Sequence, residues 1–325
     1  MNYPFLVKFQ SIIDETDALS DISKASYKAR LKTLTDITNH DVDWILKNCT
    51  KTMAMIKGKN VTEPQTIRSY INAILACFKH SNLQTTHKKA YQCWAGVRKK
   101  ISAIAQEKYE QLKASPRQIE GYVAWQDILE TRDKLGKDTD EYLLLSLYTM
   151  IPPSRADFNN VKIYNKEPTN LQKENHDNYL VVQGNTMKLV FQEFKTKSKL
   201  HTYENLLPPD LVKVIQHSLK VKPRQYLVVS PRSGEPYIKS HSFTVYFDRL
   251  LHKLFNKPVT INTLRHSYVN HLDFNTMLPA EKTHIARLMM HSVSTMDRYR
   301  LVIPAKGTQD HKEKVCTVTC KDKEH

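Results

Sequence analysis

Apolar residues in the first third of the chain recur at helical spacing. The stretch 62–81 is the clearest case and contains a helix start at Pro64. Its apolar stripe consists of Ile67, Ile71, Ile74, Leu75 and Phe78. Comparable patterns over 20–37, 41–49 and 85–112 predict three more helices. We therefore expect an entirely helical N-terminal domain.

The pattern breaks at 113–118, a polar segment that contains a proline. Helical spacing returns over 121–135 and 139–150, where a pair of prolines ends the second helix. Apolar, β-prone segments then predict a hairpin of 178–183 and 187–194, joined by a Gly-Asn turn.

A third strand is expected at 201–207, and helices resume from Pro208. The predicted fold class is mainly α with a small antiparallel sheet (α+β). It is divided into a helical domain over 1–114, a second domain over 115–303 and a tail over 304–325.

Charge points to a partner. The 325 residues carry a formal net charge of +16, which favours a polyanion such as nucleic acid. The fourth predicted helix is basic in its first half, and either a solvated face or contacts to DNA phosphates would explain this. Its candidate DNA-binding residues are Lys88, Lys89, Arg98, Lys99 and Lys100. No run of about 18 apolar residues and no signal peptide is evident, so we expect an intracellular protein without a membrane partner.

The cysteines predict no metal site. Three of the five lie in helical patterns and are expected in the core: Cys49, Cys77 and Cys93. The tail contains a His-x4-Cys-x3-Cys-x4-His pattern, formed by His311, Cys316, Cys320 and His325. Common zinc sites space their ligand pairs differently, so two free thiols are favoured, and no metal or cofactor is predicted.

One arginine falls on a face that should be buried. In the helical segment "TINTLRHSYVNHLDF", Arg265 shares a stripe with Tyr268 and Val269. A guanidinium keeps its proton and is costly to bury without an anion. Either a nearby carboxylate or a bound phosphate would supply that anion, and phosphate suits the two-pronged guanidinium well.

A second arginine raises the same question. Ser154 and Asp157 resemble a capping box, which would place Arg155 in the first turn of a helix. Helix starts attract anions, so a cation there is favourable if both address one phosphate. An ordinary exposed arginine is the alternative. Three alternating lysines end the predicted hairpin and either form a charged tip or reach a phosphate: Lys195, Lys197 and Lys199.

The segment "MMHSVSTMDRYRLV" supplies the remaining candidates, His291 and Tyr299. A phenol is a weak nucleophile unless positive charge stabilises its anion and the oxygens of the transition state. Two arginines, a lysine and a histidine around one phosphate would do so without a metal ion.

The order of these residues resembles the tyrosine recombinase (phage integrase) family. "TLRHSYVNHL" and "MMHSVSTMDRY" are the most specific parts, and the resemblance extends from about Gln118 to Val302. The helical first domain resembles the family's core-binding domain. "IPPSRADF" is similar to integrases of eukaryotic DNA viruses and virophages.

The resemblance implies a metal-independent DNA strand transferase with a 3′-phosphotyrosine intermediate. Arg155 and Arg265 would hold the non-bridging oxygens of the scissile phosphate. His291 would hydrogen-bond to one of these oxygens, and Tyr299 would attack the phosphorus. Lys195 would protonate the leaving 5′ oxygen, and the second choice for this role is the lysine two positions on, Lys197.

Two features depart from the family pattern. Asn262 occupies the position three residues before Arg265, where the family usually has histidine. An amide can contact a phosphate oxygen but cannot move a proton at neutral pH. Tyr299 also follows His291 by one residue fewer than is common, which the "SVST" turn is expected to absorb.

Several alternatives stay open at this point. A type IB topoisomerase or a telomere resolvase would use the same chemistry, and a DNA-binding relative without catalysis would fit Asn262. For a recombinase we expect double-stranded DNA and a homo-oligomer, most simply a tetramer, as partners. It would work in the nucleus or cytoplasm of a host if it is viral. The alternating run "KVCTVTC" predicts that the tail docks onto a neighbouring protomer.

Overall fold

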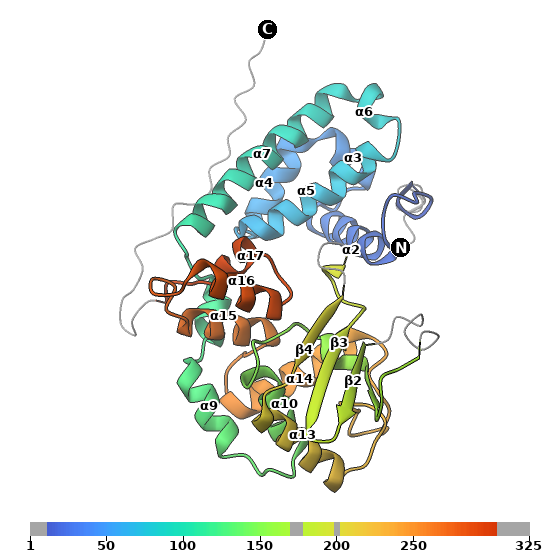
Figure 1. The fold of residues 1–325 in the computed structure, drawn as a ribbon. Coiled ribbons are helices and arrows are strands. Elements are labelled where there is room, and N and C mark those ends of the chain that lie inside the picture. Colours follow the sequence, from blue (N-terminus) through green and yellow to red (C-terminus); the bar gives the residue numbers. More distant parts are fainter. Residues whose placement is uncertain (1–11, 170–177, 198–201, 304–325) are drawn as a thin grey trace. The chain divides into compact units, whose positions relative to one another are not determined.

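The computed structural model describes residues 12–169, 178–197 and 202–303 (Figure 1). Lys199 and the whole tail lie outside the described residues, with the thiol and histidine pattern and the predicted docking strand. The chain divides into two compact units, the first ending at Gln111 and the second beginning at Leu112. This division lies three residues before the predicted domain boundary.

Helices form the first unit throughout its described part (Figure 1). They are α2 (Asp21–Thr38), α3 (Val42–Lys47), α4 (Cys49–Gly58), α5 (Pro64–Lys79), α6 (Leu83–Thr86) and α7 (Lys88–Glu110). The Oγ of Ser20 caps α2 by accepting the N–H of Ser23 at 3.3 Å. The sequence pattern does not predict α4, because its threonines and lysines leave only a weak apolar stripe.

The core of the first unit follows the predicted stripe of α5. Ile71, Ile74 and Phe78 are fully buried there, together with Trp94 of α7. Two of the three predicted core cysteines are buried, Cys49 and Cys77, and Cys93 is half-buried. Burial raises the pKa of the Cys77 thiol to about 12, so this thiol stays protonated and unreactive at neutral pH.

The second unit combines helices with a small sheet. Its helices are α8 (Pro116–Gly121), α9 (Trp125–Asp133), α10 (Asp140–Thr149), the short 3₁₀ helix η1 (Asp157–Asn160), α13 (Pro209–Val221), α14 (Ser240–Phe255), α15 (Ile261–His271), α16 (Pro279–Leu288) and α17 (Val293–Asp297). Its strands are β1 (Val161–Tyr164), β2 (Asn178–Gln183), β3 (Thr186–Phe191) and β4 (Tyr203–Leu206).

The sheet has the order β1-β2-β3-β4. The predicted hairpin and third strand are present, because β3 pairs antiparallel with both β2 and β4. Gly184 forms the hairpin turn in the left-handed region at φ 57°, where glycine carries no steric penalty. The pattern misses β1, which pairs parallel with β2, so the sheet is mixed rather than antiparallel. The predicted class, mainly helical with a small sheet, is confirmed.

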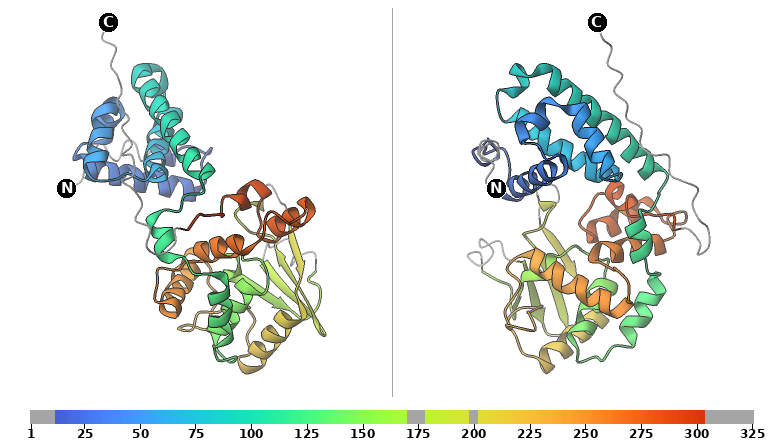
Figure 2. Two further views of the ribbon diagram at one scale, coloured as in Figure 1. Left: turned by 90° about the vertical axis from the view of Figure 1, so that its left-hand side faces the viewer. Right: turned by 180° about the vertical axis from the view of Figure 1, so that it is seen from behind.

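Helices α10, α13 and α14 cover one face of this sheet (Figure 2). Leu180, Leu189 and Phe191 point into the resulting core, as expected when every second strand residue faces the same side. A smaller cluster of Tyr179 and Val190 occupies the other face. None of the helices within the described ranges is long and apolar enough to cross a membrane.

Candidate active site

Arg265 lies inside the second unit, as its place on the apolar stripe predicts. Thr260 caps α15 by accepting the N–H of Thr263, and Arg265 follows one turn later with 1% of its surface exposed. Its Nη2 donates to the carbonyl of Met289 at 3.4 Å. Its Nε and Nη1 are buried without a hydrogen-bond partner among the described residues.

No carboxylate in the described part of the chain forms an ion pair with Arg265. A structural salt bridge among the described residues therefore does not explain the burial of Arg265. Burial is the main cause that lowers the pKa of Arg265 to about 10, and the positive charge of Arg155 adds to it. The guanidinium is still charged at neutral pH and is held at a cost in free energy.

Arg155 is positioned differently from the prediction. It lies in a turn before η1 rather than inside a first helical turn, so the expected capping box is wrong. The two prolines end α10, and both backbone polar groups of Arg155 then form hydrogen bonds. Its carbonyl accepts the hydroxyls of Tyr148 and Ser154, and its N–H donates to Asp157 at 3.0 Å. No helix begins at Arg155 and its N–H is occupied, so its guanidinium is the group that can bind an anion.

A tight turn after α16 fixes His291. Its N–H donates to the carbonyl of Ala286 at 2.8 Å, and the N–H of Met290 donates to that of Arg287. This bond pattern closes a helix with one left-handed residue, which is usually glycine. Here it is Met290, at φ 58°. The side chain of Met290 is buried in the main core and holds the turn in place.

The protonation state of His291 follows from its neighbours. Arg155 Nη2 lies 3.4 Å from His291 Nδ1, and a guanidinium can only donate, so Nδ1 accepts. Burial, together with Arg265 and Arg155, lowers the pKa of His291 to about 3. The ring is therefore neutral with its hydrogen on Nε2. That N–H is buried and has no partner among the described residues.

Tyr299 lies beside Arg265 and His291. The N–H of Tyr299 donates to the carbonyl of Met296, just beyond the end of α17. Its ring centroid is 4.8 Å from Cζ of Arg265 and 5.2 Å from the ring centroid of His291. The "SVST" segment accommodates the short spacing by forming α17 with Ser292 as its cap.

The site has a surplus of hydrogen-bond donors. Among the described residues, two nitrogens of Arg265 and one of His291 carry N–H groups that have no acceptor. The carboxylate of Asp157, whose charge acts on Arg265, accepts the backbone N–H of Arg155 and forms no ion pair with either guanidinium among the described residues. Buried donors normally have acceptors, so this arrangement fits a ligand that offers several oxygens and negative charge. A phosphate diester has both properties.

The lysine turn lies next to the His291 loop. Thr196 Oγ1 donates to the carbonyl of Met290 at 2.9 Å, which ties the end of the hairpin to this loop. Lys197 forms an ion pair with Glu193. Lys195 is exposed and makes no ion pair or hydrogen bond with another described residue. Lys195 is therefore the better placed of the two to move toward a ligand.

The remaining candidates are exposed. Asn262 lies in the first turn of α15 with its side chain in solvent. The five basic residues of the first unit, Lys88, Lys89, Arg98, Lys99 and Lys100, are all exposed on α7. Within the described ranges, no group of three or more His, Cys, Asp or Glu side chains is arranged to hold a metal ion.

Sequence reasoning misses three residues that hold the tyrosine segment. His266 Nδ1 lies 2.8 Å from the carbonyl oxygen of Tyr299. Asn270 bonds to both backbone groups of Leu301, and Gln118 lies 3.1 Å from His266 Nε2. The only sequence clue is that His266 and Asn270 are one helical turn apart next to Arg265.

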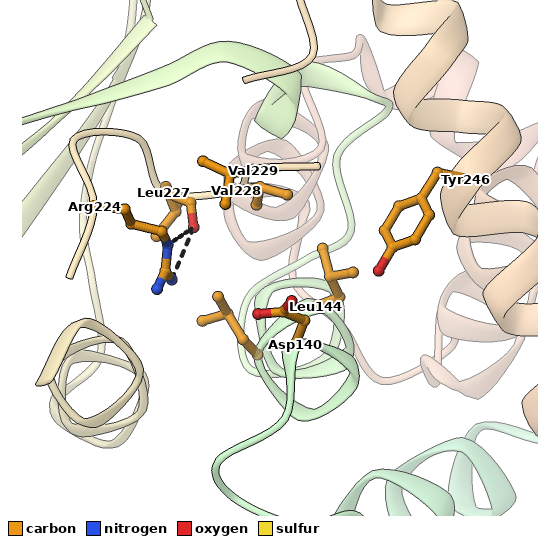
Figure 3. Close-up of a pocket in the computed structure, with 8 residues that line it drawn as sticks. Asp140, Leu144, Arg224, Leu227, Val228, Val229 and Tyr246 are labelled. Atoms are coloured by element: carbon orange, nitrogen blue, oxygen red, sulfur yellow. Dashed lines mark hydrogen bonds between the residues drawn. The ribbon is translucent and has the colours of Figure 1, made fainter. Parts of the chain in front are cut away.

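A separate pocket in the second unit is lined by Asp140, Leu143, Leu144, Arg224, Leu227, Val228, Val229 and Tyr246 (Figure 3). Its arginine is not a free anion ligand. Arg224 Nε and Nη2 donate to the carbonyl of Leu227, and Nη1 donates to that of Lys222 at 2.8 Å. These bonds fix the chain after α13, so Arg224 has a structural role.

No protein-family model matches this chain, and no curated protein sequence matches it. Solved structures are similar to it, among them the following two. The crystal structure of a lambda integrase(75-356) dimer bound to a COC′ core site aligns with a TM-score of 0.55 and 12% identity, over 96% of this chain and 98% of that chain. The crystal structure of XerA recombinase aligns with a TM-score of 0.40 and 16% identity, over 92% of this chain and 94% of that chain.

The lambda integrase structure has the higher TM-score of the two and is the one that is similar in fold. The second unit has the fold of a lambda integrase catalytic domain, mostly helical with a small mixed sheet. At this level of identity the likeness concerns the fold, and the chemistry has to be argued from the site.

Proposed function

We propose that this protein is a tyrosine recombinase of the integrase type, which cuts and rejoins double-stranded DNA through a 3′-phosphotyrosine. One observation carries the proposal. Three buried donor nitrogens, two on Arg265 and one on His291, have no acceptor among the described residues, and both side chains lie close to the ring of Tyr299. A scissile phosphate would satisfy these donors and place its phosphorus next to a phenol.

In the proposed reaction the phenolic oxygen of Tyr299 attacks the phosphorus. A P–O bond to tyrosine forms and the bond to the 5′ oxygen breaks. Arg155, Arg265 and the Nε2–H of His291 stabilise the charge on the non-bridging oxygens. Lys195 gives its proton to the leaving oxygen, and the phenolic proton is released to water. The phosphodiester energy is kept in the covalent bond, so the reverse steps rejoin DNA without a cofactor or a metal ion.

The exposed basic residues of α7 are proposed to contact DNA phosphates outside the scissile position. Each such contact would release bound counterions, so affinity should fall with rising salt. The lambda integrase structure is described as a dimer bound to DNA. For this chain we propose assembly of a tetramer on DNA, with the tail over 304–325 as a contact between protomers. We also propose that the protein acts on DNA inside a cell and that its reaction integrates a viral genome.

Two other functions use parts of the same site. A type IB topoisomerase would cut and reseal one duplex without exchanging strands. A catalytically inactive relative would bind DNA without forming a covalent bond, and the exposed amide of Asn262 in place of histidine favours it. We prefer the recombinase, because a mere DNA-binding protein has no need for uncompensated buried donors around a tyrosine.

Covalent capture tests the proposal. Nicked duplexes with a randomised core, from which the cut fragment diffuses away, trap any protein–DNA bond that survives denaturant. The wild-type chain should form adducts whose sequenced DNA reveals a preferred site, and Tyr299→Phe should bind the same DNA without forming any. Adducts that persist in Tyr299→Phe would show that Tyr299 is not the nucleophile. Strand exchange between two captured duplexes separates the recombinase from the topoisomerase.

A further inference from the structure

We propose that His266 and Asn270 are positioning residues that clamp the main chain around Tyr299 and so aim its hydroxyl at the phosphate. This inference rests on the proposed function of Tyr299 as the nucleophile. Neither side chain is among the groups that we propose to contact the phosphate. Both bond to backbone atoms of the segment that carries the tyrosine, and the His266 ring also packs against the ring of Tyr299, with the centroids 4.9 Å apart.

The hydrogen bonds of His266 determine its tautomer. A carbonyl oxygen can only accept, so the 2.8 Å contact to the carbonyl of Tyr299 requires a hydrogen on Nδ1. In the neutral ring Nε2 then accepts, and the amide nitrogen of Gln118 donates to it at 3.1 Å. The oxygen of this amide accepts the N–H of Ser115 at 2.8 Å, which fixes the orientation of the amide. Both ring nitrogens are occupied, and the side chain is 5% exposed.

Asn270 extends the clamp by one peptide. Its Nδ2 donates to the carbonyl of Leu301 at 2.9 Å, and its Oδ1 accepts the N–H of Leu301 at 2.8 Å. The N–H of Val302 then donates to the carbonyl of Leu112 at 2.8 Å. The backbone from Tyr299 to Val302 is thus held by four hydrogen bonds from outside the segment.

Helix α15 presents the clamp residues and Arg265 on different faces. His266 and Asn270 lie four positions apart and share a face, whereas Arg265 precedes His266 and points about 100° away around the helix. One rigid element therefore carries both a proposed ligand of the phosphate and the clamp on the nucleophile. A helix of this kind fixes the distance between the two without a direct bond.

Three variants test the clamp in the full chain. His266→Phe keeps the ring but removes the N–H, His266→Asn places an amide donor near the position of Nδ1, and Asn270→Ala removes the second contact. With a captured suicide substrate, His266→Phe should slow adduct formation about 10- to 100-fold, the range expected for a small misplacement of a reacting group. Its DNA affinity should stay within about twofold, and His266→Asn should regain most of the rate. His271→Phe, at an exposed position of the same helix, is the matched control.

A second readout does not depend on DNA. Trypsin cleaves after Arg298 and Arg300, on either side of Tyr299. Release of the clamp should therefore speed cleavage at these two sites in His266→Phe and Asn270→Ala, with thermal unfolding measured in parallel. Asn270→Ala keeps the test possible if the buried His266→Phe variant does not fold.

The outcomes are distinguishable. Wild-type rates of adduct formation and of trypsin cleavage in both His266→Phe and Asn270→Ala would overturn the clamp. Equal slowing in His266→Phe and His266→Asn, with trypsin cleavage unchanged, would also overturn it and would indicate a direct chemical role for the imidazole. If the wild-type chain forms no adduct, the proposed function fails, and faster trypsin cleavage in the variants still supports the clamp.

Discussion

Replacement of Arg265 by methionine should stabilise the free protein while it abolishes DNA cleavage. Burial lowers the pKa of Arg265 from its usual value above 12 to about 10. Because each tenfold change in an acid equilibrium corresponds to about 1.4 kcal/mol, the charged form is held in the fold at a cost of about 3 kcal/mol. Both folded and unfolded chains are protonated at pH 7, so this cost is fully present there. It fades only above about pH 10, where the folded state begins to release the proton.

Methionine fills a similar volume without charge, and it loses the bond from Nη2 to the carbonyl of Met289. Replacing buried charged groups by apolar residues of similar volume is often neutral or stabilises a protein by about 1–4 kcal/mol, and the cost of holding this single charge places Arg265→Met toward the stabilising side. After the lost hydrogen bond is subtracted, we expect Arg265→Met to gain about 2 kcal/mol. For a unit of this size that corresponds to a rise in Tm of about 4–8 °C.

Scanning calorimetry of the full chain at pH 7 measures this difference. Arg155→Met is the matched control, since Arg155 is half-buried and its replacement should change Tm little. Added sulfate should raise the Tm of the wild-type chain more than that of Arg265→Met, because an anion bound at the site stabilises only the folded state. A Tm that falls by several degrees in Arg265→Met would refute the reasoning, since it would show that the arginine is part of a stabilising ion pair.

Four further outcomes follow from the site. Tyr299 lies beside Arg265 of its own chain, so a mixture of Tyr299→Phe and Arg265→Ala should not restore adduct formation, whereas cleavage by a neighbour's tyrosine would restore it. Lys195→Ala should lose cleavage of normal DNA but cleave a substrate with sulfur at the 5′ bridging position, because a thiolate leaves without being protonated. Lys197→Ala should cleave both substrates. The reverse pattern would assign the proton transfer to Lys197. Arg155→Lys should lose about 10- to 1000-fold in rate, because a point charge cannot grip two oxygens. Wild-type cleavage should continue in excess chelator, and a requirement for added magnesium would contradict the proposed chemistry.

Local periodicity was sufficient to predict the placement of Arg265. Its stripe along one helix face required burial, and an arginine that must be buried has few possible partners. The hairpin was also predictable, because β-prone segments flank a glycine turn. By contrast, β1 has only four residues, and its partner β2 begins more than ten residues later in the chain. No local sequence pattern therefore predicts β1.

The errors and omissions at the site have a common physical cause. The conformation of Arg155 depends on hydroxyls from Tyr148 and Ser154, and only one of these is adjacent in sequence. The role of His266 depends on where the chain returns more than thirty residues later. Such contacts follow from tertiary structure, which residue spacing alone does not specify.

Met290 makes the precision of His291 depend on the main hydrophobic core. A methionine in the left-handed region costs about 1–2 kcal/mol, and burial of its side chain, worth about 2 kcal/mol, offsets this strain. If the core loosens with warming, the turn loses this support, and the position of the His291 ring becomes less well defined. Shortening the Met290 side chain should therefore make the proposed DNA cleavage heat-sensitive, so that it is lost a few degrees below the temperature at which the domain unfolds. If the protein is a recombinase, such a variant would recombine DNA only at low temperature.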